Sequence, residues 1–208
     1  MTRLIRRTLP LLALAAVAAV LSGCYLPARF DAEIEINRRG YYKMFFSGYM
    51  VDTRLYKDLK EGKVQGAQEV EEVKKLQADI ERDPSASDWG YIKQGYFKMQ
   101  WKREGDLLKA KSVTFLRRNE HIFGISYNKE TYVVNVLGRS LSKDQKDQIV
   151  KSGLNTTGEL RVITDTKVVS HNADEVKDFP ARGPNTKVYV YRIPNIYRAT
   201  PQMQISLR

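Results

Sequence analysis

The chain has 208 residues, 42% of them hydrophobic, and carries a formal net charge of +11. This length suits one domain of ordinary size, with enough chain for a real hydrophobic core. The single cysteine, Cys24, excludes a disulfide framework within the chain, so an oxidising compartment is tolerated without one.

Residues 1–23 have the organisation of an export signal. Three arginines precede an unbroken row of Leu, Ala and Val over residues 11–21. That row is too short to cross the roughly 30 Å apolar core of a bilayer as a permanent helix. A positive start, a short apolar stretch and small residues at the end are typical of a signal peptide.

The stretch Leu21-Ser22-Gly23-Cys24 resembles the lipobox of bacterial lipoproteins. In that family the cysteine receives a thioether-linked diacylglycerol, the signal is cut before it, and the new amine is usually acylated. The resemblance therefore implies that Cys24 is the lipidated first residue of the mature chain. Two or three acyl chains, at about 0.8 kcal/mol per buried methylene, form a stable anchor. The alternative is a plain buried thiol in an uncleaved anchor helix.

These features divide the chain into a signal peptide (1–23), an acylated N-terminus with a short tether (24–28) and a single domain (29–208). The membrane is then a partner through the acyl chains on Cys24, and the cell envelope is the expected location. Tyr25, rather than aspartate, follows the cysteine. By the sorting habit of the lipoprotein family, this favours the periplasmic leaflet of an outer membrane over the outer face of the cytoplasmic membrane.

Removal of residues 1–23, which carry three arginines and no acidic residue, leaves a net charge of +8. A basic protein held beside anionic lipid gains about 1 kcal/mol for each basic group near the surface. The alternative is that the charge serves simple solubility. Nucleic acid is not an expected partner, because a lipid anchor places the domain outside the cytoplasm.

Residues 30–36 alternate apolar and polar side chains, the pattern of a strand with one wet face. Arg38-Arg39-Gly40 predicts a turn, and residues 41–51 predict a returning strand that is apolar on both faces. Such a strand is typical of a sheet centre covered on both sides. The alternative is a strand that lines an apolar ligand cavity.

Residues 64–82 carry the apolar stripe of an amphipathic helix, which Pro84 ends. We expect this stripe to lie on the sheet, since the acidic residues beside it do not suit a membrane surface.

Residues 97–102 predict a further strand, and Glu104-Gly105 predicts a two-residue turn before a return over residues 107–118. In that register Trp101 lies opposite Leu108, and four lysines share the outer face. This basic face is the candidate contact with anionic head groups or with an envelope protein complex, and its members are Lys98, Lys102, Lys109 and Lys111.

The remaining segments predict further strands around one short helix that starts after Ser142 and runs through Val150. The strands are expected at residues 122–127, 131–137, 160–164, 168–171, 188–193 and 203–207. The predicted fold is therefore α+β, with one antiparallel sheet of about seven to nine strands, one long amphipathic helix packed on a face, and a short second helix.

The search for catalytic chemistry gives no candidate. His121 and His171 have no second ligand at metal-binding spacing, and no Gly-x-Ser-x-Gly nucleophile motif occurs. We expect no enzyme, no metal site and no cofactor.

The globular part resembles the LppM-type lipoprotein family. The resemblance rests on the segments 158–162 and 167–174, followed after a loop by the aromatic strand 188–191. In that family a lipobox precedes an α+β domain, so the resemblance implies an envelope lipoprotein that binds lipid or glycolipid. It supplies no catalytic residues. The family's chains often carry a transmembrane helix after the domain, whereas this sequence ends in a strand pattern at Arg208.

Six apolar residues define the candidate ligand cavity, namely Tyr42, Met44, Phe46, Phe97, Met99 and Trp101. If the helix over 64–82 packs down on them, they form a dry core; if it stands off, they line a pocket for an acyl chain. The function expected is a non-catalytic lipid or glycolipid binding module on a membrane anchor. The alternative is a tethered interaction subunit of an envelope assembly or transport complex.

Overall fold

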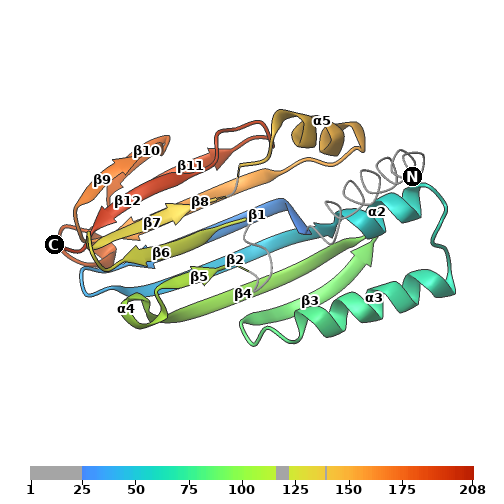
Figure 1. Ribbon diagram of the computed structural model, residues 1–208, viewed down its shortest axis with the longest axis horizontal. Coiled ribbons are helices and arrows are strands. Elements are labelled where there is room, and N and C mark those ends of the chain that lie inside the picture. The colour runs from blue at the N-terminus through green and yellow to red at the C-terminus, as the bar shows by residue number, and fades with distance from the viewer. Residues whose placement is uncertain (1–24, 116–121, 139) are drawn as a thin grey trace, which may run out of the picture.

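The computed structural model describes residues 25–115, 122–138 and 140–208. The predicted signal peptide, the lipidation residue Cys24 and His121 lie outside the described residues. The described part is an α+β fold built from two β-sheets, with helices at their margins (Figure 1).

The larger sheet is mixed and has seven strands. Its centre is the predicted hairpin, in which β1 and β2 pair antiparallel and place Ile36 opposite Tyr42. On the other side of β1 lies β8, which runs parallel to it. Across the sheet the order is β10 (Glu175–Asp178), β11 (Lys187–Ile193), β8 (Thr157–Thr164), β1 (Tyr25–Ile36), β2 (Tyr41–Asp52), β4 (Tyr96–Asp106) and β3 (Ala86–Lys93).

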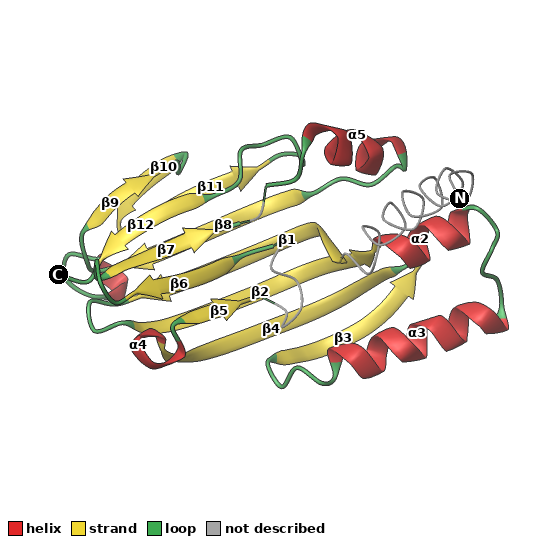
Figure 2. Cartoon of the chain, viewed as in Figure 1, coloured by secondary structure: helices red, strands yellow, loops and turns green. Residues whose placement is uncertain are grey.

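The smaller sheet is antiparallel and has five strands. Across it the order is β5 (Ser112–Thr114), β6 (Gly124–Asn128), β7 (Val133–Leu137), β12 (Gln202–Ser206) and β9 (Val168–His171). It lies over one face of the larger sheet, as Figure 2 shows.

The core forms where the apolar faces of the two sheets meet. Phe46 of β2 stacks on Phe115, with ring centroids 4.3 Å apart, and Trp101 of β4 meets the same ring edge-on at 5.2 Å. Val134 and Ile205 of the smaller sheet are completely buried in this cluster. Alternation along each strand sends apolar side chains inward, which is why two sheets cover each other efficiently.

The helices lie at the margins of the sheets (Figure 2). They are α2 (Thr53–Lys60), α3 (Ala67–Ile80), α4 (Leu107–Ala110), α5 (Lys143–Lys151) and the 3-10 turn η2 (Pro180–Arg182). The predicted helix start at Ser142 is confirmed, because Ser142 and Gln145 form a reciprocal capping box.

The prediction of one antiparallel sheet of seven to nine strands is wrong. The strands divide into a seven-stranded mixed sheet and a five-stranded antiparallel sheet. The physical reason is the area that must be buried. The apolar face of a seven-stranded sheet is far wider than one 14-residue helix can cover, so a second sheet packs on it.

The prediction that the long helix covers a sheet face is also wrong. Helix α3 runs beside the edge strand β3, and only its last residue, Ile80, is buried. Tyr91 of β3 donates a hydrogen bond to Glu69, and Arg54 pairs with Glu72 at 3.2 Å. These polar contacts hold α3 at the margin, so part of its apolar stripe stays in water, and Val70 is 52% exposed.

The predicted turn at Glu104-Gly105 does not form. Strand β4 continues to Asp106, whose side chain caps α4 by accepting a hydrogen bond from the Leu108 amide. Trp101 therefore lies opposite Phe46 and Ala86 rather than opposite Leu108. The chain changes direction here because Asp106 caps a helix, and not because Gly105 forms a β-turn.

The predicted short tether over residues 24–28 is part of a strand where the structure describes it. Strand β1 starts at Tyr25, which pairs with Asp52, and Leu26 pairs with Val51. Tyr25, the residue that follows Cys24 in the sequence, is therefore already part of the sheet.

Candidate functional site

An apolar groove of about 90 Å³ lies at the end of the molecule where β1 begins. Strands β1 and β11 of the larger sheet, helix α5 and the loops before β6, β8 and β12 contribute to it. Its apolar wall is formed mainly by Leu26, Pro27, Phe30, Ile122, Phe123 and Ile193.

Two glycines shape the deeper part of this wall. Phe30 has Gly48 and Gly158 as its neighbours in the sheet. A Cβ atom at Gly158 would lie 2.4 Å from the Phe30 carbonyl oxygen and 2.7 Å from its ring. The absence of side chains on both flanks therefore lets the Phe30 ring lie close to the strands and reach Phe123, 5.5 Å away between centroids.

The rim of the groove is a loop over residues 194–201 that several hydrogen bonds hold in place. The Asn155 side-chain oxygen accepts hydrogen bonds from the amides of Ile196, at 3.0 Å, and Thr156, at 2.9 Å. Ile196 is buried by this contact, while Ala199 stays exposed at the rim.

Thr156 is the unusual polar residue of the groove. Its side chain is only 9% exposed, and its hydroxyl has no hydrogen-bond partner in the described part of the chain. A buried hydroxyl left unpaired costs about 1–3 kcal/mol. A polar atom of a bound molecule would remove that cost.

Two cationic side chains also line the groove. The Arg198 guanidinium donates to the Asp174 carboxylate, so its charge is balanced within the protein. Lys146 of α5 has no ion-pair partner among residues 25–115, 122–138 and 140–208. Lys146 therefore contributes an uncompensated positive charge beside an apolar space.

The six residues predicted to form a ligand cavity are all buried, and none lines the groove. Five belong to the core cluster between the sheets, whereas Phe97 packs against Trp89 and Tyr91 of β3. The space beside Met44, Phe46 and Trp101 measures about 10 Å³, which is near the lower limit for one water molecule. The Trp101 indole N–H donates to Asp83 at 3.0 Å, which fixes the ring in this core. Tyr42, Met44, Phe46, Phe97, Met99 and Trp101 thus pack as core residues in the structure.

The four lysines of the predicted basic face do not share one face. Lys98 and Lys102 point outward from β4, beside Tyr49 and Phe45 of β2. Lys109 lies in α4, and Lys111 follows that helix with a positive φ of 62°. The predicted grouping is wrong because the hairpin that would have paired these segments does not form.

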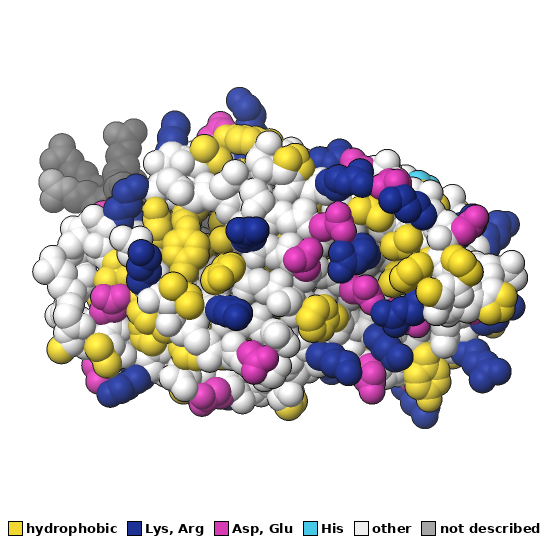
Figure 3. All heavy atoms as spheres, turned by 180° about the vertical axis from the view of Figure 1, so that it is seen from behind, with side chains coloured by type: hydrophobic (Ala, Val, Ile, Leu, Met, Phe, Trp, Pro, Cys, Tyr) yellow, Lys and Arg dark blue, Asp and Glu magenta, His cyan; other side chains and the backbone are white. Residues whose placement is uncertain are grey.

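The outer face of the larger sheet carries exposed aromatic residues among its charges. Tyr41, Phe45 and Tyr49 of β2 are 59%, 39% and 39% exposed, so the expected cover on both sides of this strand is present on one side only. Figure 3 shows this side of the molecule, where basic and hydrophobic side chains are interspersed.

A buried carboxylate lies at the start of β1. Asp52 is 2% exposed and accepts a hydrogen bond of 2.7 Å from the Leu55 amide, which caps α2. Burial raises the pKa of Asp52, and the Leu55 amide partly opposes that rise. Burial, followed by the nearby Asp52 charge, also raises the pKa of Tyr25 well above its usual range.

Of the two histidines, His121 lies outside the described residues and His171 lies at the end of β9. His171 accepts a hydrogen bond from the Ala173 amide at 3.2 Å and packs against Tyr189. Within the described ranges, no three His, Cys, Asp or Glu side chains are placed to hold a metal ion. No helix in the same ranges is long and apolar enough to cross a bilayer.

Comparison with known proteins adds little to this description. No protein-family model and no curated protein sequence matches the chain. Among solved structures, it is similar to the folded domain of the LppM protein of Mycobacterium tuberculosis, determined by NMR. That match has 14% sequence identity and a TM-score of 0.38, and it covers 86% of this chain and 88% of that one. A match at this level does not establish a shared family.

Proposed function

We propose that the protein is a lipid-anchored lipoprotein of the cell envelope whose domain binds one further lipid in the groove. The acyl chain lies against Phe30, Phe123 and Ile193, and an anionic head group pairs with Lys146. The observation that carries the proposal is the Thr156 hydroxyl, which is buried in the lining of the groove and has no hydrogen-bond partner among the described residues.

The place of the groove along the chain supports a lipid ligand. Leu26 and Pro27 line it, and they follow Cys24 by two and three residues. Acylation of Cys24 would hold the groove mouth near the membrane surface. An acyl chain could then enter without a long exposure of its methylenes to water, which costs about 0.8 kcal/mol for each methylene.

The size of the groove limits how much of the ligand is enclosed. Its volume of about 90 Å³ is several times the roughly 10–15 Å³ that one water needs. It is smaller than an engineered cavity of roughly 150 Å³ that binds benzene. The groove therefore holds a segment of one acyl chain, while the remainder stays outside.

Native mass spectrometry of the mature protein tests lipid binding. We expect a retained phospholipid mass beyond the anchor mass, and its loss when Ala199→Trp fills the groove rim. The control is Ala181→Trp, a change at an exposed alanine of η2 that does not line the groove. Equal lipid retention by both variants, or no lipid on the wild-type protein, contradicts the proposal.

The anchor is tested separately with Cys24→Ser. This variant should stay unprocessed by lipoprotein maturation and should incorporate no radiolabelled palmitate. Label found in the variant would disprove that Cys24 is the acylated residue. The residue after it, Tyr25, supports placement in the periplasmic leaflet of an outer membrane, which fractionation of the two membranes would check.

A second candidate function is that of a tethered interaction subunit. The exposed row of Tyr41, Phe45 and Tyr49, with Lys98 and Lys102 beside it, favours this alternative, since interfaces are enriched in aromatic anchors. A photo-reactive amino acid at position 45 should then crosslink in cells to the same defined protein as one at position 49. A crosslinker at Val70 on α3, exposed to a similar degree, is the control.

A further inference from the structure

The ordered domain starts directly after the proposed anchor. Strand β1 begins at Tyr25, and this residue is already paired with Asp52 of β2. Consecutive Cα atoms lie 3.8 Å apart, so an acylated Cys24 would leave no flexible spacer between the bilayer and the fold. The end of the domain that holds Tyr25 must then face the membrane.

Two helices and a loop surround this end, and hydrogen bonds join them. Helix α2 starts immediately after Asp52, and its Tyr56 hydroxyl and Lys60 ammonium both donate to the Ser152 carbonyl, at 3.2 and 2.6 Å. Ser152 is the C-cap residue of α5. From the loop, the Tyr197 hydroxyl donates to Asp147 of α5 at 2.7 Å.

We call residues 53–63, 143–152 and 194–201 the anchor-end surface. Figure 1 shows α2 and α5 at the end of the molecule opposite the C-terminus. The surface carries eight basic and four acidic residues, a net charge of +4. It also exposes two larger apolar side chains, Val150 at 40% and Tyr197 at 48%.

We infer that the anchor-end surface docks on the anionic head groups of the membrane that holds the acyl chains, with the sheets standing away from the bilayer. The inference rests on acylation of Cys24 in the proposed function. A surface of lysines with single apolar side chains between them matches the charged head-group layer in both chemistry and sign.

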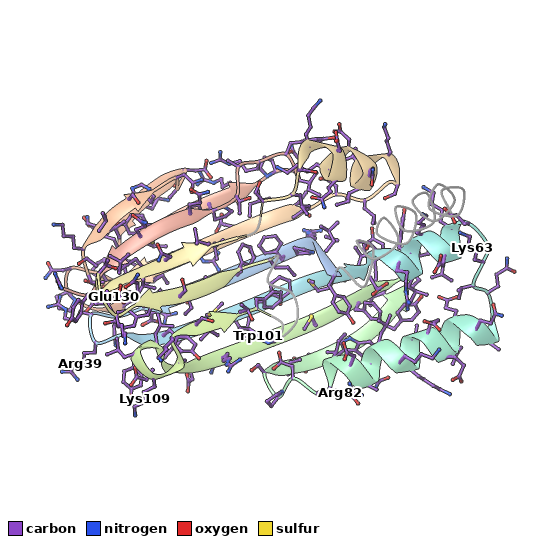
Figure 4. The ribbon with its side chains drawn as sticks, viewed as in Figure 1. Arg39, Lys63, Arg82, Trp101, Lys109 and Glu130 are labelled. Atoms are coloured by element: carbon purple, nitrogen blue, oxygen red, sulfur yellow. The ribbon has the colours of Figure 1, made fainter. Side chains whose placement is uncertain are left out.

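Distance along the strands separates this surface from the other lysines. Strand β2 has 12 residues between Tyr41 and Asp52, which span roughly 40 Å at about 3.3 Å per residue. Lys109 lies beyond the far end of that strand, and Figure 4 shows it at the opposite end of the molecule from Lys63. Charges farther from the head groups than about 8 Å are largely screened at physiological salt.

Lysine footprinting of the mature acylated protein in vesicles tests the inference. A membrane-impermeant amine reagent is applied to protein in phosphatidylglycerol–phosphatidylcholine vesicles and in pure phosphatidylcholine vesicles. We expect labelling of Lys57, Lys63 and Lys151 to fall about fivefold in the anionic vesicles and to recover in high salt. Labelling of Lys102, Lys109 and Lys111 should not change.

Two results would overturn the inference. Protection of Lys98 and Lys102 would show that the domain lies on its sheet face, and equal labelling in both vesicle types would show no docking on anionic lipid. A triple change of Lys57, Lys63 and Lys151 to Gln should abolish the salt-dependent protection, whereas the matched triple change of Lys102, Lys109 and Lys111 should keep it.

The same samples separate this inference from the proposed function. Failure of the protein to float with vesicles would overturn the anchor and the inference together. The absence of a groove lipid in native mass spectrometry would overturn only the binding module, because Lys57, Lys63 and Lys151, whose labelling tests docking, do not line the groove.

Discussion

Thr156 is the residue where stability and ligand binding have opposite requirements. Its hydroxyl is buried without a partner in the part of the chain that the structure describes. An apolar group of similar shape would suit the empty fold better, whereas a hydroxyl suits a groove that receives a polar atom. The side-chain oxygen of the neighbouring Asn155 already accepts hydrogen bonds from two backbone amides, so it is not available to the Thr156 hydroxyl.

Thr156→Val should therefore keep the protein stable and weaken lipid retention. We expect the free energy of unfolding to stay level or rise by about 1 kcal/mol, since an unpaired buried hydroxyl is removed. Thermal unfolding and the lipid-to-protein ratio of the purified protein measure the two effects. A clear loss of stability would mean that the hydroxyl is bonded in the folded state, and the groove would then lose its polar site.

Asp52 gives a prediction about pH at the start of β1. Burial raises its pKa above the ordinary 3.8, so the folded protein holds this proton more tightly than the unfolded chain does. Stability from this group is complete below the ordinary pKa and is lost as pH rises through the raised one. Asp52→Asn keeps an oxygen that caps α2 but cannot ionise.

We expect Asp52→Asn to unfold at a higher denaturant concentration than the wild type at pH 7 and to equal it near pH 3.5. Asp52→Ala is the matched control, because it removes the cap and should cost about 1 kcal/mol at both pH values. Urea unfolding at the two pH values measures this. If the wild type became more stable than Asp52→Asn as the pH rises to 7, the predicted pH dependence would be wrong.

At the scale of elements, α3 is a loosely packed helix, because only one of its 14 residues is buried. Its polar ties are Tyr91 to Glu69 and Arg54 to Glu72, and Ile80 is its single buried residue. Burial and the hydrogen bond to Glu69 together raise the pKa of Tyr91 to about 12, so the hydroxyl stays a donor at neutral pH.

Tyr91→Phe should loosen α3 without unfolding the domain. Hydrogen exchange of the α3 amides should become about tenfold faster or more, since a hydrogen bond to a charged group is worth about 1.5–3 kcal/mol. Lys74→Gln removes only an exposed pair with Glu71 and should leave exchange unchanged. Unchanged hydrogen exchange in Tyr91→Phe would show that apolar contacts, and not the hydrogen bond to Glu69, hold α3 in place.

Local patterns predicted several elements correctly. Alternation and a turn located the β1–β2 hairpin, and Ser142 located the start of α5. Helix α2 was missed because it has only eight residues, so Leu55 and Leu59 give a single helical repeat directly after an apolar strand. The Gly105 turn failed for a related reason, since Asp106 caps a helix there.

At the scale of the whole molecule, the sequence could not predict which segments cover the apolar face of the larger sheet. Tyr42, Phe46 and Trp101 were recognised as inward-facing, yet the cover is a second sheet formed by later segments. Local periodicity carries no information about pairing over 120 residues, such as the parallel contact of β1 with β8. The groove was missed for the same reason, because Leu26, Thr156 and Ile193 meet only in the folded chain.

The central claim is that the groove at the start of β1 receives an acyl chain. Photo-crosslinking tests it most directly, with the mature protein in vesicles that contain a phospholipid bearing a diazirine in its acyl chain, and with adducts mapped by mass spectrometry. The account predicts adducts on Phe123 and Ile193, which come from two separate segments of the groove lining. These adducts should disappear in Ala199→Trp and persist in Ala181→Trp. Adducts confined to the anchor-end surface, and equal in the two variants, would contradict it.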